Sequence, residues 1–257
     1  AGLARTKFNL PGSLEQYLGQ RARSNNKMQG IFVTGTDTGV GKTIVCGLLA
    51  RYLLNRGYSV ITQKWAQTGC LDIGSSDINL HLQLMGIDQR CLSSDLTYIL
   101  PYTFKAPFSP HLASRMERKI ISPQKIKKSF QALSKRFNFV LVEGTGGTLV
   151  PFDRRRLLID IAKELGLSVL IVAQNKLGAI NHALLTIEAL KARKMEILGI
   201  IFNNFPGEKA IIARDNPRIV RELSAEAILG ILPWDNDLQK LHKKFIPIGN
   251  KIWKKIA

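Results

Sequence analysis

The segment GTDTGVGKT at residues 35–43 limits the possible folds more than any other part of the chain. It follows the apolar run 31–33 and precedes apolar residues that recur at helical spacing over 44–54. A strand, a glycine-rich turn and a helix in this order predict a phosphate-binding loop, where backbone N–H groups and the helix dipole hold phosphate oxygens. The first glycine stands one residue earlier than in the usual G-x-x-x-x-G-K-[ST] pattern, so this loop is longer than usual.

Each residue type in the loop suggests a role in holding a nucleotide with Mg²⁺. Lys42 is expected to neutralise the β and γ phosphates, and the Thr43 hydroxyl is expected to ligate Mg²⁺. The expected nucleotide-binding residues of the loop are Gly35, Thr36, Asp37, Thr38, Gly39, Val40, Gly41, Lys42 and Thr43.

The rest of the chain alternates short apolar runs with longer helical patterns. The runs are continuous and do not alternate with polar residues, which is typical of parallel strands covered on both faces. This predicts an α/β fold, a doubly wound and mostly parallel sheet in one P-loop NTPase-like domain. The expected strands are 31–34, 59–62, 139–142, 169–173, 197–202 and a weaker one at 227–232, and the expected helices are 42–56, 76–86, 122–137, 156–166 and 179–194.

Two acidic residues are candidate Mg²⁺ ligands beside Thr43. Glu143 ends the buried run 139–142, so its carboxylate is expected at the carboxyl end of a strand, where open α/β sheets bind ligands. Asp77 lies at the start of a predicted helix, where it could instead be an ordinary N-cap. Both alternatives for Asp77 stay open at this point.

Composition adds a few limits. A chain of 257 residues with 45% hydrophobic content can bury a large core. No run of about 18 apolar residues and no signal pattern is present, so we expect a cytoplasmic protein with no membrane partner. The net charge of +18 is spread along the chain without interleaved aromatic residues, so we expect no specific nucleic-acid partner. The three cysteines have no metal-binding spacing and are expected to be reduced.

The expected layout has three parts. Residues 1–29 lack a sustained period and are interpreted as a basic arm. Residues 30–236 contain the alternating strand and helix patterns and form the expected domain. Residues 237–257, rich in lysine, are interpreted as a basic tail.

Several further segments together resemble one enzyme family, the dethiobiotin synthetases. They run in order between about residues 30 and 234 and are highly specific as a set. Besides FVTGTDTGVGKT, the segments are QKWAQTG, PYTFKAPFSPHLAS, VEGTGG, KLGAINHALLT and ILGILPW.

The resemblance implies an ATP- and Mg²⁺-dependent ligase acting on small molecules. The family takes 7,8-diaminopelargonate, CO₂ and ATP, and one amine forms a carbamate that attacks the γ-phosphate to give a carbamic-phosphoric anhydride. The second amine then closes a cyclic urea, which gives dethiobiotin, ADP and phosphate. Such a reaction gathers several negative oxygens, so catalysis should depend on positioning and on fixed positive charge.

The resemblance also implies roles for individual residues. Lys42, Lys64 and Thr38 match the catalytic positions, and Thr43, Asp77 and Glu143 match the Mg²⁺ set. Asn203 matches the residue that reads adenine, with the backbone near Pro233 completing that pocket. The positions that match contacts to the diamine substrate are Thr38, Lys64, Thr68, Gly146 and Gly147. The longer loop would let residues 36–38 reach both reactants.

The segment KLGAINHALLT implies a homodimer. Residues 176–178 follow a predicted strand and open a helix at about Ala179, so the N–H groups of Ala179, Ile180 and Asn181 are expected to form an anion site with Gly178. In the family this helix start belongs to the neighbouring subunit and holds the substrate carboxylate. The active site is therefore expected near the subunit interface.

Two alternatives remain open. Related partition and septum-site ATPases (the ParA and MinD proteins) are switches that bind DNA or membrane and carry a signature lysine, K-G-G-x-G-K-T, where this chain has Asp37. A related amide-forming ligase with a different acceptor is the other alternative. It stays open because Trp65 stands where the family normally has proline after the catalytic lysine.

Overall fold

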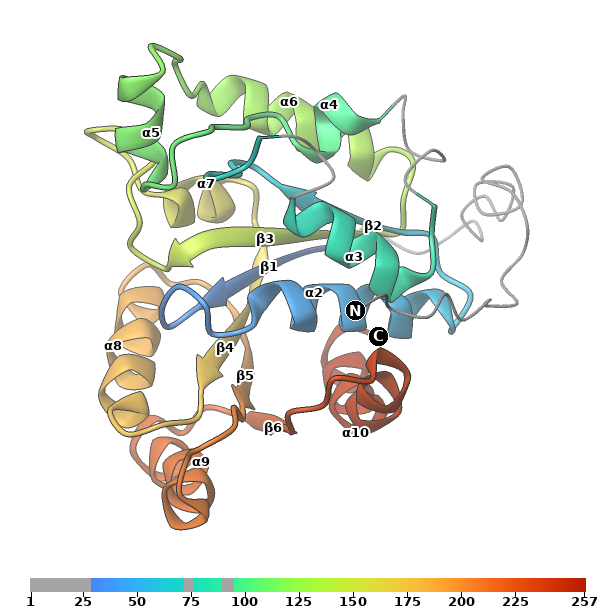
Figure 1. Ribbon diagram of the computed structural model, residues 1–257, viewed down its shortest axis with the longest axis vertical. Helices are drawn as coiled ribbons and strands as arrows, with labels where there is room; N and C mark the ends of the chain where they lie inside the picture. The colour runs from blue at the N-terminus through green and yellow to red at the C-terminus, as the bar shows by residue number, and fades with distance from the viewer. Residues whose placement is uncertain (1–28, 72–75, 89–94) are drawn as a thin grey trace.

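A computed structural model describes residues 29–71, 76–88 and 95–257 of the chain. Six strands form one sheet in the order β2-β3-β1-β4-β5-β6, and every neighbouring pair is parallel (Figure 1). This confirms the predicted doubly wound α/β fold. The expected arm at 1–29 lies outside the described residues except for Gln29, the first residue of β1.

The apolar runs predicted all of these strands, and the observed strand ends differ from the predicted ones by at most five residues. The longest extension is in β3, which continues past Glu143 to Gly147 through three glycines, so that the predicted ligand lies inside a strand. The strands are β1 (Gln29–Gly35), β2 (Val60–Lys64), β3 (Phe139–Gly147), β4 (Ser168–Gln174), β5 (Ile197–Asn203) and β6 (Ile228–Leu232).

The five predicted helices are present, and four others accompany them in the described part of the chain. Glycines in the left-handed conformation follow several of them, including Gly57 and Gly166, as helix-stop residues do. The helices are α2 (Lys42–Leu54), α3 (Asp77–Met85), α4 (Leu96–Ile99), α5 (Pro110–Met116), α6 (Pro123–Ser134), α7 (Leu158–Glu164), α8 (Ala179–Lys191), α9 (Ala210–Ser224) and α10 (Leu238–Ile256).

The direction of each crossover decides which face of the sheet a helix covers. From β1 the chain moves to the β2 edge, and α2 covers one face together with α3 and α10, both of which contact it. The later crossovers run the opposite way, so right-handed connections place α6, α7, α8 and α9 on the other face. Ligands of such sheets bind at the carboxyl ends of the strands near the point where the direction reverses, which here is around β1.

The segment interpreted as a basic tail forms α10, which sequence analysis did not predict. Its apolar residues Leu241, Phe245, Ile248 and Ile252 are buried in the same core as the sheet, while its lysines face solvent. Gly249 packs so closely on Tyr52 of α2 that a Cβ there would lie 2.6 Å from the ring. Residues 238–256 are therefore packed into the core of the fold.

None of the helices in the described ranges is long and apolar enough to cross a membrane. Cys46 and Cys70 are buried and are not joined in a disulfide, and Cys91 lies outside the described residues. Burial raises the pKa of the Cys46 thiol well above its usual value.

The contact between α10 and α2 predicts a pH-dependent stability. His242 on α10 is 8% exposed, and its Nε2 lies 3.4 Å from the Asn55 amide nitrogen. Burial, with the nearby charge of Arg51, lowers the pKa of His242 from 6.5 to about 4. Because the unfolded chain then binds this proton more readily than the folded one, neutral His242 contributes to the free energy of unfolding. This contribution is fully present above pH 6.5 and is lost as the pH falls toward 4.

We expect His242→Gln to remove this contribution, on the order of 1 to 2 kcal/mol between pH 7 and 4.5. Urea unfolding of both proteins across this pH range measures it, with His182→Gln on α8 as the matched control. Parallel stability curves for the parent and His242→Gln would show that His242 does not carry this pH dependence.

Candidate active site

The phosphate-binding loop leaves β1 with no space for a side chain at its first glycine. A Cβ on Gly35 would lie 2.8 Å from the Asp37 carbonyl oxygen and 3.0 Å from Lys42 Nζ. The Lys42 ammonium, buried inside the loop, donates to that same carbonyl at 2.9 Å. The start of α2 has no side-chain cap and no acidic residue in its first turn. This end of the helix is thus suited to an anion.

The longer loop has an exposed tip. Asp37, Thr38 and Gly39 are exposed, whereas Gly35 and Val40 on either side are buried. A Cβ on Gly146 of β3 would lie 3.5 Å from Thr38 Oγ1, so the loop tip and the β3 end are neighbours. The structure therefore brings Thr38 and Gly146 together, two residues that the sequence analysis places in the substrate site.

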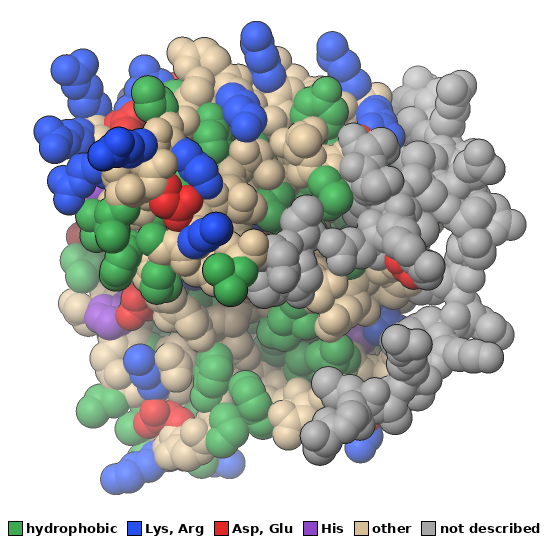
Figure 2. Space-filling model, turned by 45° about the horizontal axis from the view of Figure 1, so that its top comes forward, with side chains coloured by type: hydrophobic (Ala, Val, Ile, Leu, Met, Phe, Trp, Pro, Cys, Tyr) green, Lys and Arg blue, Asp and Glu red, His purple; other side chains and the backbone are tan. Residues whose placement is uncertain are grey.

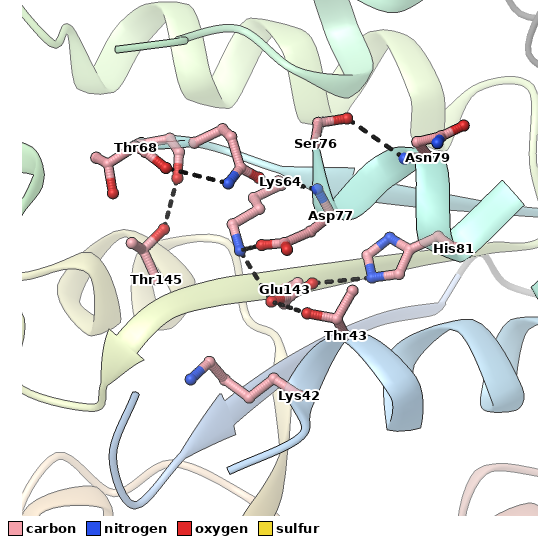
Figure 3. A network of polar contacts seen from close by, with 12 residues as sticks. Lys42, Thr43, Lys64, Thr68, Ser76, Asp77, Asn79, His81, Glu143 and Thr145 are labelled. Atoms are coloured by element: carbon pink, nitrogen blue, oxygen red, sulfur yellow. Dashed lines mark hydrogen bonds and ion pairs between the residues drawn. The ribbon is translucent and has the colours of Figure 1, made fainter. Parts of the chain in front are cut away.

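The side chain of Glu143 lies at the centre of a buried polar cluster (Figure 3). Its Oε1 accepts from Lys64 Nζ at 2.8 Å and from Thr43 Oγ1 at 3.1 Å. Lys64 also bonds to the Asp77 carboxylate, so its ammonium lies between two acidic groups. Four of the predicted residues, from α2, β2, α3 and β3, thus meet at one place.

The charges in this cluster support one another. Burial alone would raise the pKa of Glu143, but the Lys64 ammonium and contacts with His81 lower it to about 2. Burial alone would lower the pKa of Lys64, but Glu143 and Asp77 raise it. Burial lowers the pKa of Lys42 to about 8, partly offset by Glu143. At neutral pH, Lys64 and Glu143 therefore stay charged as a buried pair.

Asp77 is not the N-cap of its helix, which settles the alternative left open by the sequence. Ser76 takes that position and accepts from the Asn79 amide at 3.3 Å. The Asp77 amide donates to the Gln67 side chain at 3.2 Å, and its carboxylate is left to face Lys64. Sequence analysis did not single out Gln67, because nothing in its local pattern marks it as a support for a distant helix start.

Asn203 and Pro233, matched to adenine recognition, line one pocket of about 290 Å³ beside the loop. The Asn203 amide donates to the Val40 carbonyl at 3.0 Å, which ties the end of β5 to the loop. Phe205 and Trp234, whose rings are 5.5 Å apart, form its aromatic part. An apolar pocket with a few polar groups suits a flat heteroaromatic base. Phe205 was not predicted from the sequence.

Trp65 lies outside the polar cluster. Its ring is fully buried and stacks on Phe32 of β1 with 5.4 Å between centroids. The indole N–H donates to the Gln63 side chain at 2.9 Å. The large side chain that departs from the family pattern therefore fills the core beneath Lys64.

The start of α8 differs in one detail from the expectation. Gly178 is left-handed and no side chain caps the helix, but the Ala179 N–H donates to the Lys176 carbonyl at 3.0 Å. Ala179 therefore does not offer a free N–H, because the preceding turn uses it. Helix α8 packs on β4 and α9, whereas Lys64 belongs to β2 at the far edge of the sheet. Thr68 lies near Thr145 above β3 (Figure 3).

The fold and these contacts define a P-loop nucleotide-binding protein with an apolar pocket beside the loop and a buried lysine-carboxylate cluster beyond it. A family profile described as an AAA domain matches residues 29–242. An ATP-dependent dethiobiotin synthetase of Haemophilus ducreyi is 43% identical over 185 residues, covering 72% of this chain and 86% of the relative. One from Thermodesulfovibrio yellowstonii is 37% identical over 219 residues, covering 82% and 91%. The chain belongs to the dethiobiotin synthetase family.

Solved structures of a cell division ATPase and a ParA protein share the fold. The cell division ATPase MinD of Pyrococcus furiosus aligns with a TM-score of 0.56 at 17% identity, covering 88% of this chain and 99% of that one. The pNOB8 ParA protein, solved bound to nonspecific DNA, aligns with a TM-score of 0.58 at 13% identity, covering 89% and 98%. At such low identity these likenesses concern the fold alone.

Asn203 packs so closely against Gly41 of the loop that adding a methyl group at Gly41 is expected to weaken nucleotide binding. A Cβ on Gly41 would lie 2.0 Å from Asn203 Nδ2, and the residue has φ 95°. We expect Gly41→Ala to lower the affinity for a fluorescent ADP analogue by about tenfold or more, on the order of 1.4 kcal/mol. Gly57→Ala is the matched control, because Gly57 has φ +85° with nothing within 4 Å. Equal affinity in both variants would contradict this view of the loop.

Proposed function

We propose that this protein is an ATP-dependent dethiobiotin synthetase that closes the cyclic urea of dethiobiotin from 7,8-diaminopelargonate, CO₂ and ATP. Relatives at 43% and 37% identity carry that name. The observation that carries the proposal is the second buried lysine, Lys64, at 4% exposure and beside the phosphate loop. A nucleotide-binding site alone needs Lys42, whereas a carbamate forming next to the γ-phosphate needs a further fixed positive charge.

In the proposed reaction the protein forms no covalent bond to the substrate, and its side chains act by positioning and charge. Lys42 and Lys64 approach the reacting oxygens from two sides and stabilise the charge that gathers as the carbamate attacks phosphorus. Thr38 and Thr68 would orient the diamine, and the backbone of Gly146 and Gly147 would border it. The proximity of Thr38 to Gly146 supports this arrangement.

The residues Thr43, Asp77 and Glu143 fit an Mg²⁺ ion that travels with the nucleotide. They offer a hydroxyl and two carboxylates, which are the hard oxygen ligands that Mg²⁺ prefers, and phosphate oxygens and water would supply the others. The Thr43 hydroxyl is already within 3.1 Å of Glu143. When bound, the ion would neutralise phosphate charge and leave positioning to the side chains.

The homodimer is part of the proposal. The start of α8 lies on a different part of the sheet from Lys64, so a substrate amine at Lys64 and a carboxylate at α8 of the same chain would lie far apart. Leu177 and Leu185 on this side of the molecule are 79% and 56% exposed, and Leu149 is 52% exposed. Exposed apolar residues around a helix start favour a subunit interface.

The basic surface does not favour the switch alternative. Figure 2 shows Lys and Arg side chains on the face over α5 and α6, with acidic and apolar residues between them. Asp37 occupies the position of the signature lysine of the switch proteins and is exposed at the loop tip. We therefore propose no specific nucleic-acid or membrane partner and a cytoplasmic location.

Both buried lysines are expected to be essential for turnover. Lys42→Ala and Lys64→Ala should each lower kcat by on the order of a hundredfold or more, about 3 kcal/mol, because each deletes a preorganised charge. Diamine-dependent phosphate release measures this, with circular dichroism to check the fold and Lys243→Ala, on the exposed face of α10, as the control. Normal turnover in Lys64→Ala would refute the role given to Lys64.

Glu143→Gln is expected to raise the Mg²⁺ concentration for half-maximal activity by about tenfold or more, because the amide lacks the negative charge. Affinity for ADP without metal should change far less. Glu117→Gln is the control, since Glu117 pairs with Lys119 away from the cluster. Overlapping Mg²⁺ titrations for the parent and Glu143→Gln would make Glu143 a structural residue.

Mixing two inactive variants tests the shared active site. Ile180→Pro removes one N–H in the first helical turn, where proline is tolerated, and Ile180→Ala is its control. After subunit exchange, an equimolar mixture of Lys64→Ala and Ile180→Pro should recover about a quarter of wild-type activity, since half the dimers are mixed and each has one intact site. A mixture no more active than its two components would argue against a shared site.

A further inference from the structure

His81 is a buried histidine that has no assigned role in the proposed reaction. It projects from α3 toward Glu143 and has 0% exposure (Figure 3). Its Nε2 lies 2.8 Å from Glu143 Oε2, within hydrogen-bond distance although the ring N–H does not point straight at the oxygen. Its Nδ1 has no hydrogen-bond partner among the described residues. Burying a polar side chain without hydrogen bonds raises the free energy of the folded state, and an apolar residue at this position would avoid that cost.

The two oxygens of Glu143 have different neighbours. Oε1 faces Thr43 and Lys64, the groups that belong to the proposed nucleotide and metal site. Oε2 faces away from them, toward His81. Without His81 the second oxygen would have no close polar partner among the described residues, and the carboxylate could turn about its terminal bond, whose torsion is broad.

We propose that His81 is a positioning residue that holds Oε2 of Glu143, so that Oε1 is presented to the Mg²⁺ that accompanies the nucleotide. This inference rests on the proposed function only in taking Glu143 as a metal ligand. Lys64 cannot do the same, because it contacts the same oxygen that the metal would need. His81 contacts the other oxygen and comes from α3, the helix that also carries Asp77. One helix thus supplies one proposed ligand and orients another.

The geometry also explains why His81 escapes sequence analysis. A lone histidine on the apolar face of a helix is commonly a core residue, and its partner belongs to a strand distant in the chain. The contact forms only because α3 packs against α2 and β2, which brings the helix over the end of β3. Supporting residues of this kind typically change metal affinity about 10- to 100-fold when they are removed.

The test compares His81→Leu, which fills a similar volume without a donor, with His81→Gln, whose side-chain amide can reach the same oxygen. Mn²⁺ is the probe, added to the folded protein with ADP, and free Mn²⁺ is measured by electron paramagnetic resonance. We expect His81→Leu to weaken Mn²⁺ binding about 10- to 100-fold and His81→Gln to stay within about threefold of wild type. ADP affinity in EDTA should be unchanged in both.

The matched control is His242→Leu, because His242 is also a buried histidine but lies on α10, away from the cluster. Thermal unfolding in EDTA reports on the fold of all variants. Equal Mn²⁺ affinity in wild type and His81→Leu would overturn the proposal while leaving the metal role of Glu143 intact. Equal losses in His81→Leu and His81→Gln would also overturn it, because packing would then decide the effect. No Mn²⁺ binding by the wild-type complex with ADP would overturn both this proposal and the metal site.

Discussion

The buried carboxylate of Glu143 is the interaction on which the site depends. A charge at 2% exposure is tolerated only if it is paired and hydrogen-bonded, and its partners Thr43, Lys64 and His81 come from three separate elements. The ends of β2 and β3, the start of α2 and the face of α3 are therefore fixed relative to one another. The phosphate loop and the second lysine thereby share one rigid frame.

The same arrangement sets a requirement on the reaction. Lys64 contacts both carboxylates that would hold a divalent cation, so the ammonium and the cation compete for the same oxygens. Under the proposed function, Lys64 must exchange these contacts for substrate oxygens during turnover. Glu143 and Asp77 raise the pKa of Lys64, so it is charged while it contacts them, and a flexible stem with a compact charge suits such an exchange. Trp65 beneath it is fixed by Phe32, which confines the movement to the lysine side chain.

The sheet and the five predicted helices could be predicted because their signals are local. An apolar run followed by a glycine or a helical period depends only on neighbouring residues. Helix α10 was not predicted because many lysines separate its apolar residues in the sequence, and those apolar residues are recognised as a buried face only in the packed structure. Helix α9 was not predicted because it contains Pro217, a residue that usually ends a helix. In the site, Lys42 and Glu143 follow from their motifs, whereas His81, Gln67 and Phe205 act through contacts between distant segments. The free N–H expected at Ala179 was wrong because the preceding turn uses it.

The most direct test of the account is to follow the product. The protein, MgATP, 7,8-diaminopelargonate and ¹³C-labelled bicarbonate are incubated together and analysed by mass spectrometry, alongside a reaction without the diamine. The account predicts a cyclic urea that carries the label, with one phosphate released for each molecule of product and only slow phosphate release without the diamine. Phosphate release at the same rate with and without the diamine, and no labelled urea, would contradict it.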